Sequence, residues 1–479
     1  MLSKSNGSWV ENGQMNAKPP MPEDLSRTAM WEIILELRAK LEAAEAKIAE
    51  LETKLAKPKK TSRNSSVPSS QTIKERRENR RARRGGKPGH EGKSRENQAP
   101  DQIMECRVVV CPACGEDLQA QDQTLSSTHQ IIDIPPVSAQ VIEVRRYQAV
   151  CVCGCCVLGE VPQGYDEPQQ GFGPNVHALL SYFNGTHHIA HNRLKSLMGG
   201  VFGMDISAGA IAASLQRTAH KLAAPAHEIL LDIRRSQVIG SDETGLRVEG
   251  SNWWLWVLQT PTASYFAAAD TRAGSVLEAL MWDAVAEVWC SDLGSSQLTA
   301  PARRFAICNA HYLRKLQYAI DAGDTAFAPA FQYLLREALH LARARDDLPH
   351  DLYWQQLEVV KATAHYLLTW PTVNEEGRKL KKSFTRHFDK MWVFLERPDV
   401  PFDNNASERA LRPAVIHRKV IGAFRTEDGA AAYATYRSIE DTARKRGQPI
   451  LQVLYEVLGT PFTRLPGQHP LRAVSVFSL

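Results

Sequence analysis

The sequence contains no apolar run that approaches the roughly 20 residues needed to cross a membrane, and this excludes a protein built on membrane-spanning helices. Residues 1–25 also lack the apolar core of a secretory signal peptide. We therefore expect a cytoplasmic protein. The chain has 479 residues, of which 43% are hydrophobic and 23% charged, as is typical of soluble globular proteins. This length predicts about two to four domains.

Apolar residues are nearly absent from residues 58–100, which consist mostly of Ser, Arg, Lys, Gly and Pro. Between Lys57 and Arg95 there are 14 Lys and Arg against 3 Glu, a net charge of +11. Because the whole chain carries +5, the remainder carries −6. Such a segment cannot bury a core, and we expect an extended or disordered linker that contacts a polyanion, most commonly DNA. A solvated linker is the alternative, and the two roles are compatible. The candidate DNA contacts are Arg81, Arg83, Arg84, Lys87, His90, Lys93 and Arg95.

Cysteine is sparse outside one region, since seven of the nine cysteines fall between Cys106 and Cys156. In a reduced compartment such a cluster indicates metal binding before disulfides. CPACG at 111–115 is a C-x2-C turn, and CVCGCC follows at 151–156. Four thiolates that bind a structural Zn²⁺ would hold together a small ribbon with little core of its own. The predicted ligands are Cys111, Cys114, Cys151 and Cys153, with Cys153 and Cys156 as the alternative second pair.

Residues 30–55 carry an uninterrupted heptad pattern. Apolar residues alternate at spacings of four and three at Met30, Ile34, Leu37, Leu41, Ala44, Ile48, Leu51 and Leu55. This spacing keeps one stripe of a helix facing a partner helix. Lys40 and Glu45 occupy flanking positions from which they can pair across a parallel dimer. We expect a leucine zipper that makes a homodimer or higher oligomer, although a single amphipathic helix packed on its own chain fits the same pattern.

Residues 170–235 have helical periodicity, and residues 237–310 then change to strand patterns. Strands are predicted at 237–250, 252–260, 264–274, 286–292 and 304–310, with a helix at 275–283 between the third and the fourth. An antiparallel meander followed by strand–helix–strand units indicates a mixed α/β sheet with helices on its faces. We expect His177, His187, His188 and His191 in the helical region to be structural or surface residues.

Two acidic residues occupy positions at which a sheet can bring them together. Asp242 lies on the first of these strands, and Asp292 ends the fourth. If the two strands are neighbours, the carboxylates converge. Mg²⁺ prefers a few carboxylates together with water and phosphate oxygens, and two such ions can drive phosphodiester cleavage. A third carboxylate is needed from elsewhere in the chain.

The stretch DNNASERALRP at 403–413 is the candidate for this third group. DNN is a typical helix start, and Glu408 would lie in the first turns, close to the positive end of the helix dipole. Asp403 is a rival ligand. The neighbouring candidates for DNA contact are Asn405, Arg409, Arg412, Arg418 and Lys419.

Motifs along nearly the whole chain resemble the transposases of the insertion-sequence-66 family. In order, they are the zipper, NSSVPSSQ, GGKPGHEGKSR, CPACG with a later CxCG, GFGPNVHALLSYF, SDETGLRVEG with WWLWV, CNAHYLRK, and DNNASERALRP followed by RK. The resemblance implies a ribonuclease-H-like core whose catalytic triad is Asp242, Asp292 and Glu408. These residues would hold Mg²⁺ or Mn²⁺, with two ions at the site. It also implies a helical insertion between Asp292 and Glu408.

The expected fold class is therefore multidomain α/β, and the expected function is cleavage and joining of the terminal inverted repeats of the chain's own element to target DNA. Accessory proteins of the element and association with a bacterial nucleoid follow from the same resemblance. A catalytically inactive DNA-binding relative is the main alternative, and a tyrosine recombinase using Tyr433 or Tyr436 is a weaker one. The predicted domains are 24–57 (coiled coil), 58–103 (basic linker), 104–165 (zinc ribbon), 166–235 (helical region), 236–317 (first part of the core), 318–395 (helical insertion), 396–460 (second part of the core) and 461–479 (tail).

Overall fold

A computed structural model describes residues 35–45, 47–48, 57–65, 96–161, 165 and 171–459. The chain forms two compact units. One comprises Met1–Thr72 and His311–Arg386, and the other comprises Ile73–Ala310 and His387–Leu479. None of the described helices combines the length and apolar character that crossing a membrane requires.

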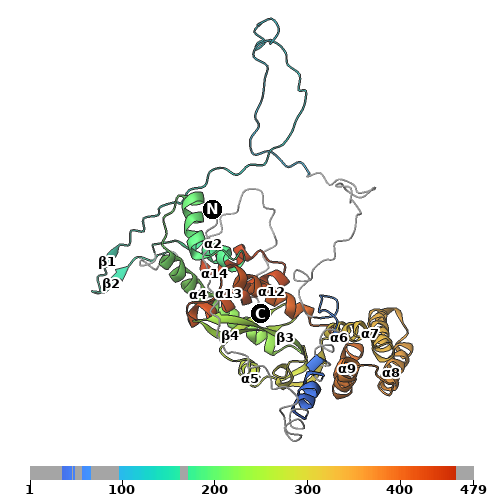
Figure 1. Ribbon diagram of the computed structural model, residues 1–479. Coiled ribbons are helices and arrows are strands. Elements are labelled where there is room, and N and C mark those ends of the chain that lie inside the picture. The colour runs from blue at the N-terminus through green and yellow to red at the C-terminus, as the bar shows by residue number, and fades with distance from the viewer. Residues whose placement is uncertain are drawn as a thin grey trace, which may run out of the picture. The chain divides into compact units, whose positions relative to one another are not determined.

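The second unit is built on a five-stranded mixed sheet with the order β5-β4-β3-β6-β7, of which Figure 1 labels β3 and β4. The strands are β3 Val238–Val248, β4 Ser251–Gln259, β5 Ser264–Ala269, β6 Ala286–Ser291 and β7 Ala302–Ile307. The first three form an antiparallel meander, while β6 lies parallel to β3 and β7 parallel to β6. The β3–β4 turn is Glu249-Gly250, both with positive φ, as the right-handed twist of a two-residue hairpin requires. The predicted mixed sheet and its five strands are confirmed.

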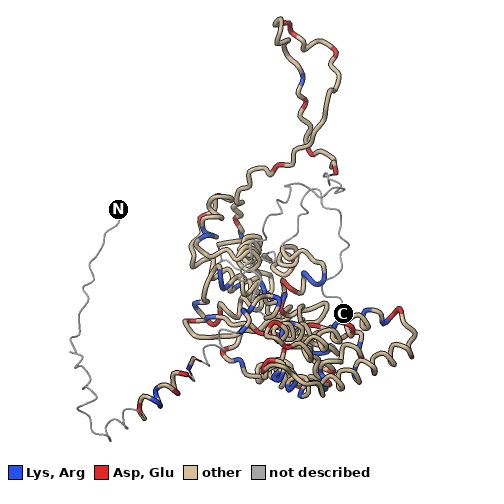
Figure 2. The backbone as a smooth tube through the Cα atoms, turned by 45° about the vertical axis from the view of Figure 1, so that its right-hand side comes forward, with Lys and Arg blue, Asp and Glu red and all other residues tan. Residues whose placement is uncertain are grey.

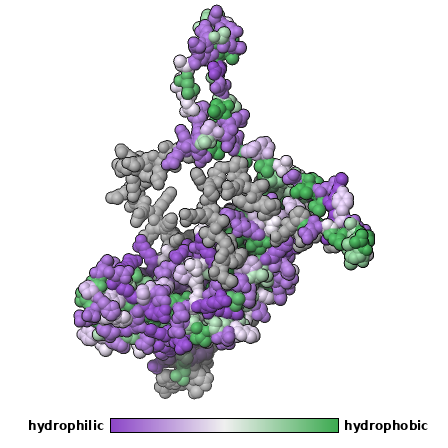
Figure 3. All heavy atoms as spheres, turned by 180° about the vertical axis from the view of Figure 1, so that it is seen from behind, coloured by the Kyte–Doolittle hydropathy of each residue, from purple (hydrophilic) through white to green (hydrophobic). Residues whose placement is uncertain are grey.

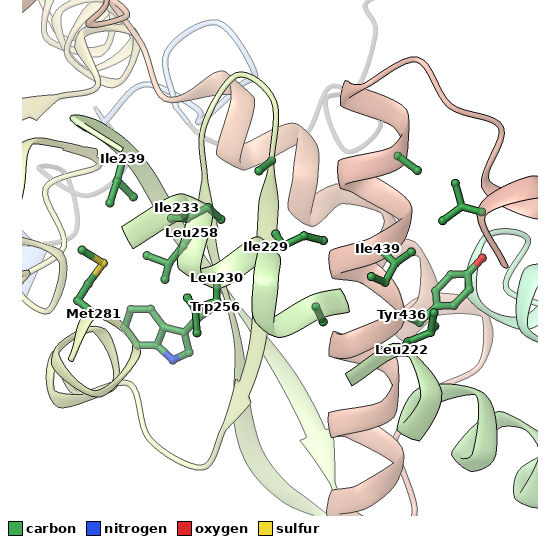
Figure 4. Packing of buried hydrophobic residues seen from close by; sticks show 14 of the residues in the cluster. Leu222, Ile229, Leu230, Ile233, Ile239, Trp256, Leu258, Met281, Tyr436 and Ile439 are labelled. Carbon is green, nitrogen blue, oxygen red and sulfur yellow. The ribbon is translucent and has the colours of Figure 1, made fainter. Parts of the chain in front are cut away.

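Alternate residues of the strands supply two hydrophobic layers, one on each face of the sheet. On one face, Trp256, Leu258 and Trp289 pack with α4 (Ala208–Arg234) and α5 (Ser275–Met281), and Figure 4 shows part of this layer. On the other face, Leu246, Leu255 and Val257 pack with α12 (Asn405–Val420). Helices therefore cover both faces, as the strand–helix pattern predicted.

Helix α13 (Glu427–Lys445) lies along β5, the edge strand of the sheet. The Phe266 N–H donates to Ser438 Oγ at 2.8 Å, and the Ser264 N–H donates to Thr442 Oγ1 at 3.0 Å. Thr442 Oγ1 in turn donates to the Ser264 carbonyl at 3.1 Å. These hydroxyls give hydrogen-bond partners to an edge that would otherwise be a template for another strand.

The helical region before the sheet consists of α2 (Pro174–Gly185), α3 (His191–Phe202) and α4, which confirms the helices predicted there. Leu180, Leu194 and Ile211 form a small core between these helices. The last helix of the unit, α14 (Ile450–Leu458), packs against α2. Two short helices, α10 (Phe388–Met391) and α11 (Val393–Glu396), precede α12.

The other unit is helical and contains α7 (Phe327–Arg343), α8 (His350–Leu367) and α9 (Glu375–Arg386). Helix α6 (Asn309–Asp321) leads into it, so the helical stretch begins before the predicted start at residue 318. Its centre holds aromatic rings from three helices, with Tyr312 edge-on to Phe384 at 4.5 Å and Phe331 stacked on Phe384 at 4.4 Å. This unit has a core of its own.

Part of the predicted disordered linker has local structure. Residues 57–65 form a turn in which Thr61 N–H donates to Asn64 Oδ1 at 2.7 Å. Asn64 is buried, and its Nδ2 donates to Asp321 Oδ2 at 2.8 Å. A side-chain amide can organise such a turn without an apolar core. The basic residues from Arg81 to Arg95 lie outside the described residues.

The N-terminal helix is described over residues 35–45 and 47–48, and basic and acidic residues alternate along it (Figure 2). The heptad residues Leu37, Leu41 and Ile48 are 59%, 59% and 55% exposed. Met30, Ile34, Leu51 and Leu55 lie outside the described residues. The apolar stripe is therefore helical and accessible over its described part, and the zipper stays a prediction.

Candidate active site

The register of the sheet brings Asp242 and Asp292 to the same face. Gly240 of β3 pairs with Cys290 of the parallel strand β6, and each aspartate lies two residues beyond its member of this pair. Since side chains alternate with a period of two, both carboxylates point to the face that α12 covers. Asp242 also pairs with Val257, a member of the hydrophobic layer on that face. The predicted adjacency of the first and fourth strands is confirmed.

Glu408 lies in the first turn of α12, and a buried asparagine fixes the start of this helix to the sheet. Asn404 is 3% exposed, and its Nδ2 donates to the carbonyl of Ser241, the residue before Asp242, at 2.7 Å. The Asn404 N–H contacts Cys308 Sγ at 3.2 Å, and its Oδ1 accepts from Ser407 Oγ at 2.7 Å. The acid-bearing helix is thereby tied to the strand that carries Asp242.

Glycine at position 240 permits this close approach. A Cβ added there would lie 2.3 Å from Gln259 Nε2, which is closer than real Cβ atoms come to other atoms, and 3.1 Å from Ser407 Oγ, which is tighter than most Cβ contacts. The first turn of α12 therefore packs directly on the β3 backbone. This packing explains why the polar residues at 404–408 sit at a buried helix start.

The electrostatics of the site favour a bound cation. Burial, together with the carboxylates of Asp292, Glu243 and Glu408, raises the pKa of Asp242 to about 7, although the Glu243 N–H that donates to Asp242 Oδ1 at 2.9 Å opposes the shift. Carboxylates that disfavour one another's charged form suit a divalent cation, because oxygen donors are the ligands Mg²⁺ prefers. The chemistry of the donor set therefore suits the metal that the sequence predicts.

Asp403, the rival ligand, has a local structural contact. Its Oδ1 accepts from the Asn405 N–H at 3.0 Å, and its Oδ2 accepts from Asn405 Nδ2 at 2.6 Å. This is a typical helix-start arrangement. It also gives Asn405, a predicted DNA contact, an intramolecular partner.

A polar network on the opposite face of the sheet was not foreseen from the sequence. Buried Gln297 lies on the loop that follows Asp292, and its amide bonds Ser241 Oγ and the Glu243 carboxylate. Trp289 Nε1 donates to Ser241 Oγ at 2.8 Å, while the guanidinium of Arg272 neutralises Glu243 at 2.6 Å. Gln297 thus connects the loop after Asp292 to the strand of Asp242. The sequence feature that could have revealed this network is Glu243, which directly follows Asp242 on the strand, so that its side chain must point to the opposite face.

The predicted basic contacts on α12 divide into two groups. Arg409, Arg412 and Lys419 are exposed. Arg418 is half-buried, and its Nη1 donates to the Gly245 carbonyl of β3, so it stabilises the packing of α12.

The two cysteine motifs form separate tight turns. In the first turn, the Gly115 N–H donates to the Cys111 carbonyl at 2.9 Å, and neighbouring backbone N–H groups lower the pKa of Cys111. The second turn joins β1 (Gln148–Val150) to β2 (Cys156–Leu158), and backbone and thiol contacts from Cys155 and Cys151 lower the pKa of Cys153. Within the described part of the chain the four predicted thiols do not come together as one metal-binding group. The zinc site stays a prediction.

The segment that carries these turns has no core of its own. No residue from 96 to 161 is buried, and large apolar side chains such as Ile131, Ile134 and Val141 lie at its surface (Figure 3). A short segment of this kind needs a metal or a partner to fold compactly.

The tyrosines of the alternative recombinase mechanism are buried. Tyr433 is 6% exposed and Tyr436 is 5% exposed, and burial raises the pKa of both phenols far above the ordinary range. The Tyr436 hydroxyl also bonds Thr186 at 2.8 Å. Neither is placed as an accessible nucleophile. Among the predicted structural histidines, buried His177 bonds Ser214 at 2.6 Å.

Comparison with known proteins shows the family of the chain. The model of a family described as "Transposase IS66 family" matches residues 170–432, more than half of the chain. That range contains Asp242, Asp292 and Glu408. A family of unknown function, DUF6444, matches residues 17–96.

A curated relative is the uncharacterized protein y4jO of Sinorhizobium fredii (strain NBRC 101917 / NGR234), which is 36% identical over 85 residues. The match covers 18% of this chain, which spans about a quarter (26%) of the relative's length. The family match over more than half of the chain is the decisive comparison, and the chain belongs to the Transposase IS66 family.

Proposed function

We propose that this chain is the DNA transposase of an insertion sequence and that it cleaves and joins DNA at the terminal inverted repeats of its element. Membership of the transposase family supports the DNA substrate. The helices on both faces of a mixed sheet with β3 next to β6 support a ribonuclease-H-like core.

Support for the proposal comes from three acidic residues carried by elements that pack together at β3, namely β3 itself, the end of β6 and α12. The parallel register aligns Asp242 with Asp292, and the Asn404 hydrogen bond to Ser241 brings the start of the Glu408 helix to the same strand. Isolated acidic residues at strand ends or in helix first turns are common. A buried aspartate whose pKa is raised by burial and by two further carboxylates is characteristic of a functional site.

Asp242, Asp292 and Glu408 would hold Mg²⁺ or Mn²⁺, which polarises phosphate oxygens and activates the attacking hydroxyl when bound. The protein residues supply position: Asn404 fixes Glu408 relative to β3, and Gln297 fixes the loop after Asp292. In the proposed reaction a water oxygen attacks phosphorus and the P–O3′ bond breaks, which leaves a DNA 3′-hydroxyl. That hydroxyl then loses its proton and attacks a phosphorus of target DNA, whose own P–O3′ bond breaks, and the released 3′-oxygen takes up a proton. No protein nucleophile is used.

The remaining predicted parts fit this function as proposals. Exposed Arg409, Arg412 and Lys419 would contact the DNA backbone, together with the basic residues from Arg81 to Arg95. The accessible heptad stripe would pair two copies of the chain. The two cysteine turns would share a structural Zn²⁺ with their backbones already shaped for it, and the element's accessory proteins would act beside the chain.

Cleavage of a supercoiled plasmid that carries the repeats flanking the gene tests the proposal. With Mg²⁺, the purified wild type should cut at the repeat ends, whereas Asp242→Asn, Asp292→Asn and Glu408→Gln should bind the ends without cutting. Asp403→Asn is the matched control and should still cut. Cleavage that survives Glu408→Gln would contradict the assigned site. Binding by all proteins, with no cutting by the wild type in the presence of the element's accessory proteins, would favour a catalytically inactive relative.

A further inference from the structure

A cavity of about 570 Å³ lies between the helical region and the α12–α13 pair, apart from the three carboxylates. Residues of α2 and α4 line one side, and residues of α12, α13 and the loop between them line the other. Its volume is within the usual range for ligand sites, about 300–1,000 Å³. The proposed reaction gives this cavity no role.

Four of its lining residues carry buried polar atoms that have no hydrogen-bond partner among the described residues: Ser181 Oγ, Thr218 Oγ1, His417 Nδ1 and Tyr433 OH. Each of these residues is at most 6% exposed. A buried polar atom without a partner is costly, and several around one cavity indicate a ligand that supplies the missing hydrogen bonds.

All four groups are neutral at physiological pH. Burial and the nearby charges of His188 and Arg437 lower the pKa of His417 to about 3, so its imidazole is uncharged. Burial also keeps the Tyr433 phenol protonated, since its pKa is raised. A neutral imidazole, a phenol and two hydroxyls all both donate and accept hydrogen bonds, which suits a polar, uncharged ligand edge better than a phosphate.

The walls of the cavity suit a flat ligand. The rings of His417 and Phe424 are stacked, with 4.9 Å between their centroids and 11° between their planes. The centroid of the Tyr433 ring lies 4.3 Å from that of His417. These three aromatic residues all line the cavity. At its margin, Arg425 and Asn192 are exposed and can meet a sugar or phosphate.

We propose that this cavity binds a nucleobase of DNA that has been turned out of the helical stack. Aromatic and apolar walls with hydrogen-bonding groups for the base edge are the recognised means of holding such a base. His417 follows Glu408 by nine residues on the same helix, roughly 14 Å along its axis. A base held here would anchor the strand close to the proposed cleavage site. This inference rests on the proposed function for its role, but base binding is testable without cleavage.

The test uses a mixed-sequence single-stranded oligonucleotide that contains one 2-aminopurine, with full-length protein and without Mg²⁺. The fluorescence should change on binding to the wild type and stay unchanged with Ala212→Phe, which fills the cavity from α4. Losing one stacked base should weaken oligonucleotide binding by roughly 5- to 150-fold. An unaltered signal and affinity in Ala212→Phe would overturn the proposal.

Tyr433→Phe provides a second test that separates binding from folding. It removes a buried hydroxyl that lacks a partner, so the melting temperature should hold or rise while base binding weakens. Tyr312→Phe is the matched control: its hydroxyl bonds Ser383 at 2.9 Å in the helical unit, so it should lower the melting temperature and leave base binding unchanged. A fall in melting temperature with undiminished base binding in Tyr433→Phe would contradict the proposal.

The plasmid assay distinguishes this inference from the proposed function. Cleavage at the repeats by a protein that gives no 2-aminopurine response would overturn the base pocket and leave the transposase assignment standing. A response that Ala212→Phe abolishes, in a protein that never cleaves, would support the pocket and count against the catalytic assignment.

Discussion

Replacing Asp242 by asparagine is expected to stabilise the metal-free protein at alkaline pH. Asp242 has a pKa of about 7 in the folded protein against 3.8 for the ordinary carboxyl, because burial and nearby carboxylates disfavour its charged form. A raised carboxyl pKa means that the folded state binds more protons than the unfolded state between pH 3.8 and 7. Stability therefore falls as pH rises through this window and stays low above it.

The size of this effect follows from the shift. About three pKa units correspond to up to about 4 kcal/mol, at 1.36 kcal/mol per unit. At pH 8 with EDTA, Asp242→Asn should be more stable than the wild type by up to this amount, which corresponds to about 2–4 °C of melting temperature per kcal/mol. At pH 4 the difference should vanish, because the wild-type carboxyl is then neutral as well. Thermal unfolding followed by circular dichroism measures the difference in stability at pH 8 and at pH 4.

Mg²⁺ and Asp403→Asn supply the controls. Saturating Mg²⁺ should raise the melting temperature of the wild type and not that of Asp242→Asn, since the cation replaces the lost protons. Asp403→Asn makes the same chemical change five residues from Glu408, but it replaces one of the two oxygens that accept hydrogen bonds from Asn405 by an NH2 donor and should destabilise the protein. The reasoning would be refuted if Asp242→Asn were less stable than the wild type at pH 8, or if its advantage grew on acidification.

Two further predictions concern positions near the site. Gln297→Leu should lower the cleavage rate or raise the Mg²⁺ requirement by roughly 10- to 100-fold while end binding is retained, because the loop after Asp292 loses its connection to β3. The matched control is Gln332→Leu, which replaces a buried glutamine of the helical unit. An unchanged Mg²⁺ titration in Gln297→Leu would count against the positioning role. Burial lowers the pKa of Lys445 from 10.5 to about 8 in the folded protein. Between pH 8 and 10.5 the unfolded state therefore binds more protons than the folded state, and the free energy of unfolding rises with pH. Wild-type stability relative to Lys445→Met should therefore increase by about 2 kcal/mol from pH 8 to pH 10, as measured by urea unfolding, and a difference independent of pH would disprove the shift.

Much of the core was predictable because strand patterns and chain order constrain a mixed sheet strongly. The five strands, the β3–β4 turn and the adjacency of the Asp242 and Asp292 strands all followed from apolar runs and turn residues. The start of the Glu408 helix was visible in DNN, although its detailed role was not. The sequence pattern marks Asn404 only as an ordinary helix start. The hydrogen bond from its side-chain amide to the Ser241 carbonyl is visible only in the folded structure.

The contacts that the sequence did not reveal are long-range and polar. Ser438 and Thr442 have the pattern of solvent-facing helix residues, yet their hydroxyls bond the β5 edge more than 170 residues away in the chain. Gln297 has no periodicity that marks it, since it lies in a 3-10 helix of only three residues, Gln297–Thr299. Hydrophobic periodicity reports which face of an element is buried and says nothing of which polar group meets which, so such contacts emerge only from the three-dimensional arrangement.

The most direct test of the central claim is a Mn²⁺ titration followed by electron paramagnetic resonance, with the protein bound to a duplex of the repeat end. If Asp242, Asp292 and Glu408 form one metal site, the wild type should take up Mn²⁺, and Glu408→Gln should lose most of this binding while keeping the duplex. Asp403→Asn should bind Mn²⁺ as the wild type does. Equal binding by the wild type and Glu408→Gln, or a loss of binding in Asp403→Asn alone, would contradict the account.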